Sequence, residues 1–336
     1  MGLILFGLIL SLGIILLSCE LFTNGIENLG KELKLGDGVV GSIFSAVGTC
    51  LPETLIPILA IFFSRKGAAG TIDIGIGAIL GAPFMLSTLA FFVTGLSALV
   101  FRKKRNTGMR MLVDPKILAR DIKFFIIVYS ISILSAVANG GYLKLIIACG
   151  LIGLYILYVI QTVSDDSNSS SKVESLIFAE IFNTKPSLKL TVIEVFIALV
   201  GIIFGAEIFI ENIKKVSEGL GVSAFLLSLI ITPIATELPE KFNSIIWVSK
   251  KKDTLALGNI TGAMVFQSCI PVAIGIIATP WKLDFIGMIS AFISIFSASL
   301  IYISLKLKNK LTPFPLLMGG VFYIVFIMIL IKGNII

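Results

Sequence analysis

The sequence predicts an all-α polytopic membrane protein with ten transmembrane helices in two inverted five-helix repeats. Hydrophobic residues make up 57% of the 336 residues and charged residues only 14%, whereas a soluble domain carries about 25% charged residues. The mean hydropathy is strongly positive, at +1.04. The chain also divides into ten apolar runs, and its first half matches its second half when the sequence is shifted along itself.

Charged or Gly/Pro-rich loops separate the apolar runs, and each run is close to the roughly 20 residues of a bilayer crossing. The third and eighth runs exceed this length, which predicts tilt or a break in those two helices. The ten predicted helices cover residues 2–19, 38–63, 73–98, 122–139, 142–162, 191–210, 222–248, 254–279, 284–305 and 314–332.

One polar segment, residues 163–190, separates the two sets of five helices. The predicted organisation is therefore a first repeat over 1–162, a linker over 163–190 and a second, inverted repeat over 191–336. Lys and Arg divide 20 to 7 between alternate loops, with the excess after the odd-numbered helices. Because cytoplasmic loops keep the basic excess, this bias predicts a cytoplasmic linker and both termini outside.

The internal match defines where the two repeats correspond. A shift of 187 residues places Glu20 on Glu207 and the segment 49–53 on the segment 236–240, and both segments share Thr, Leu, Pro and Glu. A second block matches at a shift of 181, where Gly77 and Gly81 meet Gly258 and Gly262. Five crossings is an odd number, so the second half must be inverted relative to the first. Inverted repeats place a transporter's binding site at their interface.

The two matched segments contain the candidate cation ligands. A proline inside a helix frees the carbonyl four residues earlier, and here that carbonyl lies beside a threonine hydroxyl and a glutamate. Hard cations such as Ca²⁺ and Na⁺ prefer such oxygen ligands, and a glutamate at bilayer depth is by default functional. The alternative is a protonated glutamate that serves only helix packing. The predicted ligands are Glu53, Glu240, Thr49, Thr236 and the carbonyls of Gly48 and Ala235.

On these segments the sequence resembles the cation/Ca²⁺ antiporter superfamily, in its prokaryotic type. Members have ten helices in two inverted repeats, with a Gly-Thr-Ser-x-Pro-Glu segment on the second helix of each repeat and Gly-Asn-x-x-Gly-Ser on the third. The resemblance implies exchange of Ca²⁺, or a related cation, for Na⁺ or H⁺ by alternating access. It implies Glu53 and Glu240 as central carboxylates, inorganic cations as cargo without a resident cofactor, and location in a prokaryotic cell membrane.

The sequence departs from the family pattern at several expected ligands. Cys50 replaces the first motif serine, and a thiol is a poor ligand for a hard cation, whereas Glu237 replaces the second and adds a carboxylate. Alanines 82 and 263 replace the third-helix serines, and the polar positions one turn later are Leu86 and Gln267. These changes leave the number and identity of the bound cations open, with Glu237 and Gln267 as further candidate ligands.

Lys241 follows the second central glutamate and lies four residues after Glu237, on the same helix face. Two interpretations are open. Lys241 is either a fixed internal cation in place of a transported ion, or a neutralising partner of Glu237. Both predict fewer bound cations than in a full exchanger.

Other polar features have weaker interpretations. Glu20 and Glu207 either line an ion entrance or mark solvated helix ends, and Asn259 is either a ligand or a hydrogen-bonding residue between helices. The basic cluster over 102–105 either attracts anionic membrane lipid or only retains the topology.

Several function classes are excluded or disfavoured. The chain has no histidine, which removes serine–histidine hydrolysis and His-based zinc sites, and it has no phosphate-binding loop of an ATP-driven pump. Its basic residues are not interleaved with aromatics, which argues against nucleic acid. Two alternatives to an antiporter remain: a non-transporting homologue that senses ions or acts as a scaffold, and an intramembrane acid/base enzyme. The second is disfavoured because the arginines, including Arg105 and Arg120, fall in predicted loops.

Overall fold

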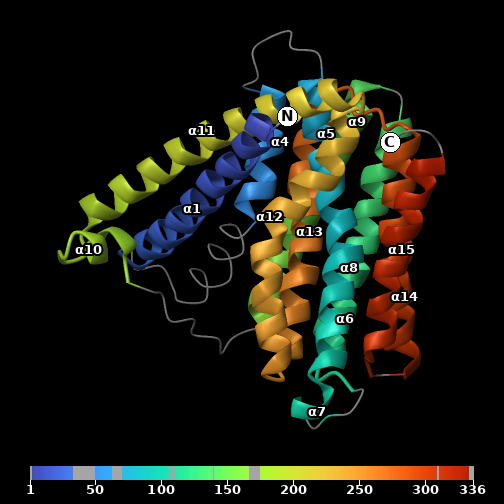
Figure 1. Cartoon of the computed structure of the whole chain (residues 1–336). Coiled ribbons are helices and arrows are strands. Elements are labelled where there is room, and N and C mark those ends of the chain that lie inside the picture. The colour runs from blue at the N-terminus through green and yellow to red at the C-terminus, as the bar shows by residue number, and fades with distance from the viewer. Residues whose placement is uncertain are drawn as a thin grey trace.

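The protein is described from a computed structural model that covers residues 2–32, 50–62, 70–105, 107, 110–138, 140–165, 175–308 and 310–332. Within these residues the fold is all-helical (Figure 1). Seven of the described helices are long and apolar enough to cross a membrane, and two shorter apolar helices accompany them. The prediction of an all-α integral membrane protein is confirmed.

The first half of the chain contains α1, α4, a long helix in three parts, α8 and α9. The three-part helix is α5, a π-helical turn η2 and α6, and a short helix α7 follows it. The bounds are α1 Gly2–Glu32, α4 Leu51–Phe62, α5 Thr71–Met85, η2 Leu86–Ala90, α6 Phe91–Val100, α7 Arg102–Arg105, α8 Pro115–Leu134, the 3₁₀ turn η3 Ser135–Val137 and α9 Gly141–Asp165.

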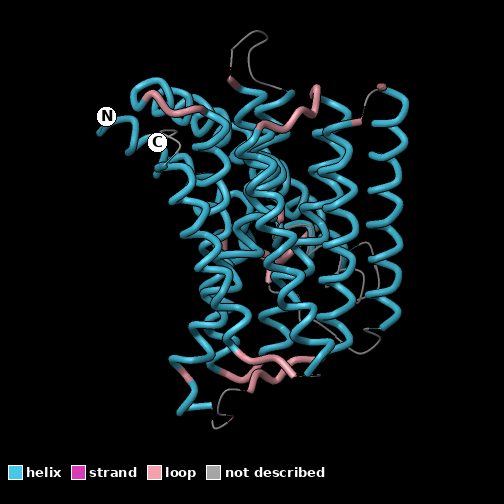
Figure 2. The backbone as a smooth tube through the Cα atoms, turned by 90° about the vertical axis from the view of Figure 1, so that its right-hand side faces the viewer, coloured by secondary structure: helices cyan, strands magenta, loops and turns pink. Residues whose placement is uncertain are grey.

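The second half begins after a short helix, α10, in the predicted linker. The bounds are α10 Ile177–Ile181, α11 Leu188–Leu220, α12 Ala224–Ser249, α13 Asp253–Ala278, α14 Phe285–Lys308 and α15 Pro313–Lys332. Figure 1 places both termini at one end of the molecule and α7 at the opposite end. Figure 2 shows loops at both of these ends and others at mid-height.

Two helices extend well beyond their predicted ends. The prediction gave 2–19 and 191–210, whereas α1 and α11 continue to Glu32 and Leu220. The extensions are amphipathic, with polar residues that end the apolar run but not the helix. The two helices pack against each other over their length (Figure 1), and Ile213 and Val216 in the α11 extension are buried. Tertiary packing therefore stabilises turns that hydropathy alone assigns to a loop.

The third helix, for which tilt or a break was predicted, contains the π-helical turn η2, which begins three residues after Pro83. The eighth helix, for which the same was predicted, is the single helix α13. α8 starts at Pro115, seven residues before its predicted range of 122–139. Asp114 caps its N-terminus by accepting from the Lys116 N–H at 2.8 Å, as an N-cap aspartate does.

Each half packs its long third helix against the last two helices of the other half. α13 contacts α8 and α9, whereas the segment formed by α5, η2 and α6 contacts α14 and α15. One large hydrophobic cluster joins these helices to α12. A second cluster joins α1, α4 and α11, so α5 and α12 lie between the two clusters.

Candidate functional site

The described candidate ligands lie on three helices that contact one another: α4, α12 and α13. Glu53 on α4 is 2% exposed, Thr236 and Glu237 on α12 are 2% and 1% exposed, and Gln267 on α13 is fully buried. α5 contacts all three helices. The structure therefore places four sequence-predicted residues within one tightly packed group of helices.

Glu53 lies in the first turn of α4. The helix begins at Leu51, with Pro52 in its first turn, where a missing N–H costs no helical hydrogen bond. The partial positive charge at a helix N-terminus stabilises a carboxylate there. Ile56 and Leu59 of the same helix are also buried. Glu53 is thus a buried carboxylate with helix-dipole support.

A row of hydroxyl groups, Ser228, Thr232 and Thr236, follows one face of α12 at spacings of four residues. All three side chains are at most 2% exposed. Ser228 donates to the Ile74 carbonyl of α5 at 2.7 Å and lies 3.1 Å from the Thr232 hydroxyl. Thr236 donates to the Thr232 carbonyl at 3.0 Å. Because a hydroxyl donates one hydrogen and keeps acceptor lone pairs, Thr236 can still offer its oxygen to a cation.

This hydroxyl row begins where α5 and α12 make backbone contact. A Cβ added at Gly77 would lie 2.3 Å from the Phe225 carbonyl oxygen, and one at Gly81 would lie 2.3 Å from that of Leu229. Small residues allow such close approach between membrane helices. In this half of the chain the repeated glycines therefore hold α12 against α5 and fix the position of the hydroxyl row.

Gln267 is buried without a hydrogen bond to any described residue. Neither atom of its amide has a hydrogen-bond partner among the described residues, and a buried unsatisfied polar group costs about 1–3 kcal/mol. The neighbouring Ser268, by contrast, donates to the Met264 carbonyl at 2.7 Å. An amide oxygen kept in an apolar interior at this cost is available as a cation ligand.

The remaining predicted ligands are described in part or not at all. Gly48 and Thr49 belong to the undescribed segment 33–49, and the side chains of Glu240 and Lys241 are not described, although their backbone is part of α12. Ala235 lies in α12 between Ile234 and Thr236. Among the described residues no group of three or more carboxylate or thiol side chains gathers in one place.

Sequence reasoning missed Ser228, Thr232 and a third buried hydroxyl on α12, Ser244, whose oxygen has no hydrogen-bond partner among the described residues. The four-residue spacing of Ser228, Thr232 and Thr236 could have identified the row. The prediction that Glu20 and Glu207 stand near helix ends was wrong, because α1 and α11 continue at least twelve residues further. Both carboxylates are exposed on these helices.

The assignment of all arginines to loops was also wrong. Arg120 lies in α8, where its Nε and a terminal nitrogen donate to Asp121 at 3.2 and 3.1 Å. Arg105 lies in α7 and forms an ion pair with Asp253 at the start of α13, and both side chains are at most 1% exposed. Neither arginine is on the helices that carry Glu53 and Glu237.

The chain belongs to the sodium/calcium exchanger protein family, which it matches over residues 3–163 and 190–332. This family consists of ion-transporting antiporters rather than enzymes, so the resemblance seen in the duplicated motif is confirmed. Similar proteins include the uncharacterized membrane protein MJ0091 of Methanocaldococcus jannaschii, 26% identical over 268 residues and 79% of each chain. The putative antiporter CaxA of Alkalimonas amylolytica is 24% identical over 276 residues, covering 81% of this chain and 80% of CaxA.

Solved structures share the fold at low sequence identity. The H⁺/Ca²⁺ exchanger CAX superposes with a TM-score of 0.72 at 16% identity, over 98% of this chain and 82% of CAX. The sodium-calcium exchanger NCX_Mj, soaked with Na⁺ and Sr²⁺, gives a TM-score of 0.58 at 22% identity, over 98% and 99% of the two chains. The chain therefore has the fold of these membrane transporters.

Proposed function

We propose that this protein is a secondary antiporter that exchanges Ca²⁺, or a related cation, for Na⁺ or H⁺ by alternating access around Glu53 and Glu240. The observation that carries the proposal is the burial of Glu53, Thr236, Glu237 and Gln267 on three mutually contacting helices. Carboxylate, hydroxyl and amide oxygens are the ligands that hard cations select. Membership of the exchanger family supplies the transport class.

Inverted repeats are part of this proposal, with α1 matching α11. Shifting α1 by 187 residues reproduces the bounds of α11 to within one residue at each end. The two helices are antiparallel, since Gly7 lies against Asn212 and Gly25 against Val195. The reciprocal packing of α13 on α8 and α9, and of α5 to α6 on α14 and α15, supports the same relation. Alternating access then follows from movement of one half against the other around a site between them.

The counter-ion is either Na⁺ or H⁺. Both occur among exchangers of this fold, as the names of CAX and NCX_Mj state. The chain lacks several family ligands, with Cys50, Ala82 and Ala263 in place of serines, so it offers fewer oxygen ligands to a second cation. Protonation of a buried carboxylate needs no further ligands, and a carboxylate beside another favours the protonated form.

The topology completes the proposal, with both termini outside and the linker in the cytoplasm of a prokaryotic cell. The 20 to 7 division of basic residues supports this orientation. So does the shared location of the two termini at the end of the molecule opposite α7 (Figure 1). In this proposal the first repeat ends at residue 162 and the second begins at residue 191.

The proposal is tested by ⁴⁵Ca²⁺ uptake into proteoliposomes loaded either with Na⁺ or at acid internal pH. Either the outward Na⁺ gradient or the outward H⁺ gradient should drive ⁴⁵Ca²⁺ uptake. Loss of a carboxylate ligand should cost at least what a charged hydrogen bond is worth, about 1.5–3 kcal/mol, so Glu53→Gln and Glu240→Gln should each lower uptake at limiting Ca²⁺ about tenfold or more.

Glu218→Gln is the matched control, because Glu218 is an exposed glutamate on α11. Its uptake should equal that of the unmodified protein. Uptake that survives both site substitutions would contradict the proposed site. Absence of uptake under every gradient, with a panel of cations and folded protein, would favour a sensor or scaffold that does not transport.

A further inference from the structure

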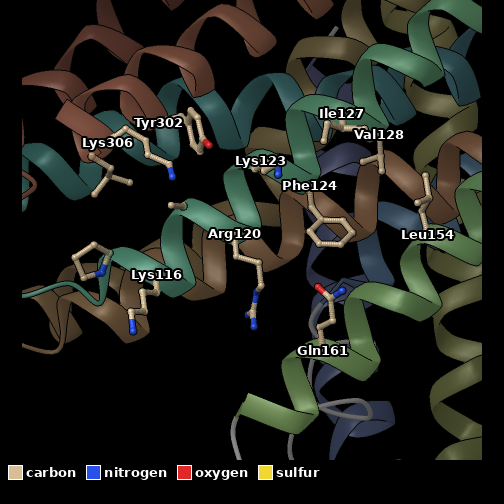
Figure 3. A pocket seen from close by; sticks show the side chains of 13 residues that line it. Lys116, Arg120, Lys123, Phe124, Ile127, Val128, Leu154, Gln161, Tyr302 and Lys306 are labelled. Carbon is tan, nitrogen blue, oxygen red and sulfur yellow. The ribbon is translucent and has the colours of Figure 1, made fainter. Parts of the chain in front are cut away.

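A second site lies away from the candidate cation site, where α8, α9 and α14 enclose a pocket of about 730 Å³ (Figure 3). Small-molecule sites have volumes of about 300–1,000 Å³. Four cationic side chains line the pocket, namely Lys116, Arg120 and Lys123 of α8 and Lys306 of α14, and no carboxylate lines it. Its charge therefore selects an anion.

The three lysines are available to a ligand. Their side chains are exposed, and within the described part of the chain none of them pairs with a carboxylate. Arg120 differs, because Asp121 holds its guanidinium at 3.1 Å and the Tyr158 ring lies below it, 5.7 Å from ring centre to guanidinium carbon. Asp121 in turn accepts from Thr261 of α13 at 2.9 Å. The pocket thus combines one ion-paired cation with three exposed lysines.

The pocket changes from basic to apolar along the helices. On α8 the stripe runs from Lys116 through Arg120 and Lys123 to Phe124 and Ile127 (Figure 3). With a rise of 1.5 Å per residue, the basic part covers about 10 Å and the apolar part continues about 6 Å deeper.

The other two walls repeat this gradient. α14 places Lys306 near its C-terminus and Tyr302 one turn further in, and the lysine lies over the tyrosine ring at 5.9 Å. α9 places Gln161 near its C-terminus and Leu154 two turns further in. All three polar ends lie on the side that the charge bias predicts to be cytoplasmic, where the anionic lipid of a cell membrane attracts basic residues.

We propose that this pocket binds an anionic phospholipid, with the phosphate at the basic end lined by Lys116, Lys123 and Lys306 and an acyl chain along Ile127 and Leu154. A soluble phosphate would use the basic end alone, whereas a phospholipid also places an acyl chain against the apolar wall. The site is independent of the proposed exchange and is tested without measuring transport.

The test is native mass spectrometry of the purified protein titrated with phosphatidylglycerol, and with phosphatidylcholine for comparison. A lysine near an anionic head group contributes about fivefold to affinity. Lys116→Gln, Lys123→Gln and Lys306→Gln combined should therefore weaken the first phosphatidylglycerol about a hundredfold, and Lys306→Gln alone about fivefold, without changing phosphatidylcholine binding. Lys123→Arg with Lys306→Arg, which keeps the charge, should bind as the unmodified protein does and shows that these positions tolerate substitution.

Lys103→Gln with Lys104→Gln is the matched control, because both lysines are exposed on α7 at the same end of the molecule. It should lose less than twofold. Equal loss in the control and the triple variant would overturn the pocket in favour of general surface attraction, as would no loss in either. If glycerol phosphate displaced phosphatidylglycerol at an equal concentration, the ligand of the pocket would be a soluble anion and not a lipid.

Discussion

Replacing Gln267 with leucine should stabilise the protein and weaken its cation affinity at the same time. Leucine has a similar size and no polar atoms, so the packing of α13 is preserved while the unbonded amide is removed. A substitution that harmed the fold would lower both properties. A change of opposite sign in the two properties is therefore diagnostic of a residue kept for binding at a cost in stability.

The magnitude follows from the burial and the missing partners of the Gln267 side chain. It is fully buried, and both its carbonyl oxygen and its amide nitrogen lack hydrogen bonds among the described residues. At the low end of 1–3 kcal/mol for each unsatisfied group, Gln267→Leu should add about 2 kcal/mol to the free energy of unfolding. For a chain of this size that corresponds to a rise of about 3 °C in Tm.

The assay is thermal unfolding in detergent across a Ca²⁺ titration. Binding to the folded state stabilises by RT ln(1 + [Ca²⁺]/Kd), so a tenfold weaker Kd should remove about 1.4 kcal/mol of the Ca²⁺-dependent stabilisation. Gln161→Leu is the matched control, because Gln161 is exposed on α9, and it should change neither quantity by more than about 0.5 kcal/mol. A Gln267→Leu protein with lower Tm, or with unchanged Ca²⁺ stabilisation, would refute the reasoning.

Two further predictions concern packing. Gly77→Ala should lower Tm in detergent, because its Cβ would lie 2.3 Å from the Phe225 carbonyl oxygen and overpacking costs about 1–3 kcal/mol. The control Gly153→Ala, whose Cβ would have no described atom within 4 Å, should instead raise Tm because alanine has the higher helix propensity. Equal effects of the two substitutions would contradict the α5–α12 contact. Asp253→Asn should destabilise by about 3–5 kcal/mol in chemical unfolding because it leaves Arg105 buried without its anion. Arg105→Met combined with Asp253→Leu should recover most of that loss, and a double variant as unstable as the single one would show that the ion pair is not the cause.

Much of the fold could be predicted from hydropathy, since every predicted apolar run contains a helix in the described residues. The errors in the predicted helix bounds have a common cause: hydropathy reflects contact with lipid and not contact between helices. The polar C-terminal ends of α1 and α11 are helical because each packs on the N-terminal part of the other helix, as Gly25 against Val195 and Gly7 against Asn212 illustrate. In the same way, α8 begins with Lys116, Arg120 and Asp121, so its first turns look like a loop.

The candidate site was predictable where a motif recurs. Glu53 and Thr236 were identified by the match between the halves and Glu237 by its place in the family motif, and their side chains are buried as a ligand role requires. Ser228 and Thr232 were not identified, although their four-residue spacing before Thr236 marks one face of α12; the register between α12 and α5 decides what that face contacts. That register depends on backbone contacts at the glycines of α5, which no spacing in the α12 sequence contains.

The most direct test of the central claim is Ca²⁺ self-exchange, which needs no knowledge of the counter-ion. Proteoliposomes loaded with ⁴⁵Ca²⁺ are diluted into buffer with or without unlabelled Ca²⁺, and the release of label is followed. Alternating access around the buried glutamates predicts that external Ca²⁺ accelerates release and that Glu53→Gln abolishes the acceleration while Glu218→Gln leaves it intact. A rate of label release that external Ca²⁺ does not change, or an acceleration that persists in Glu53→Gln, would contradict the account.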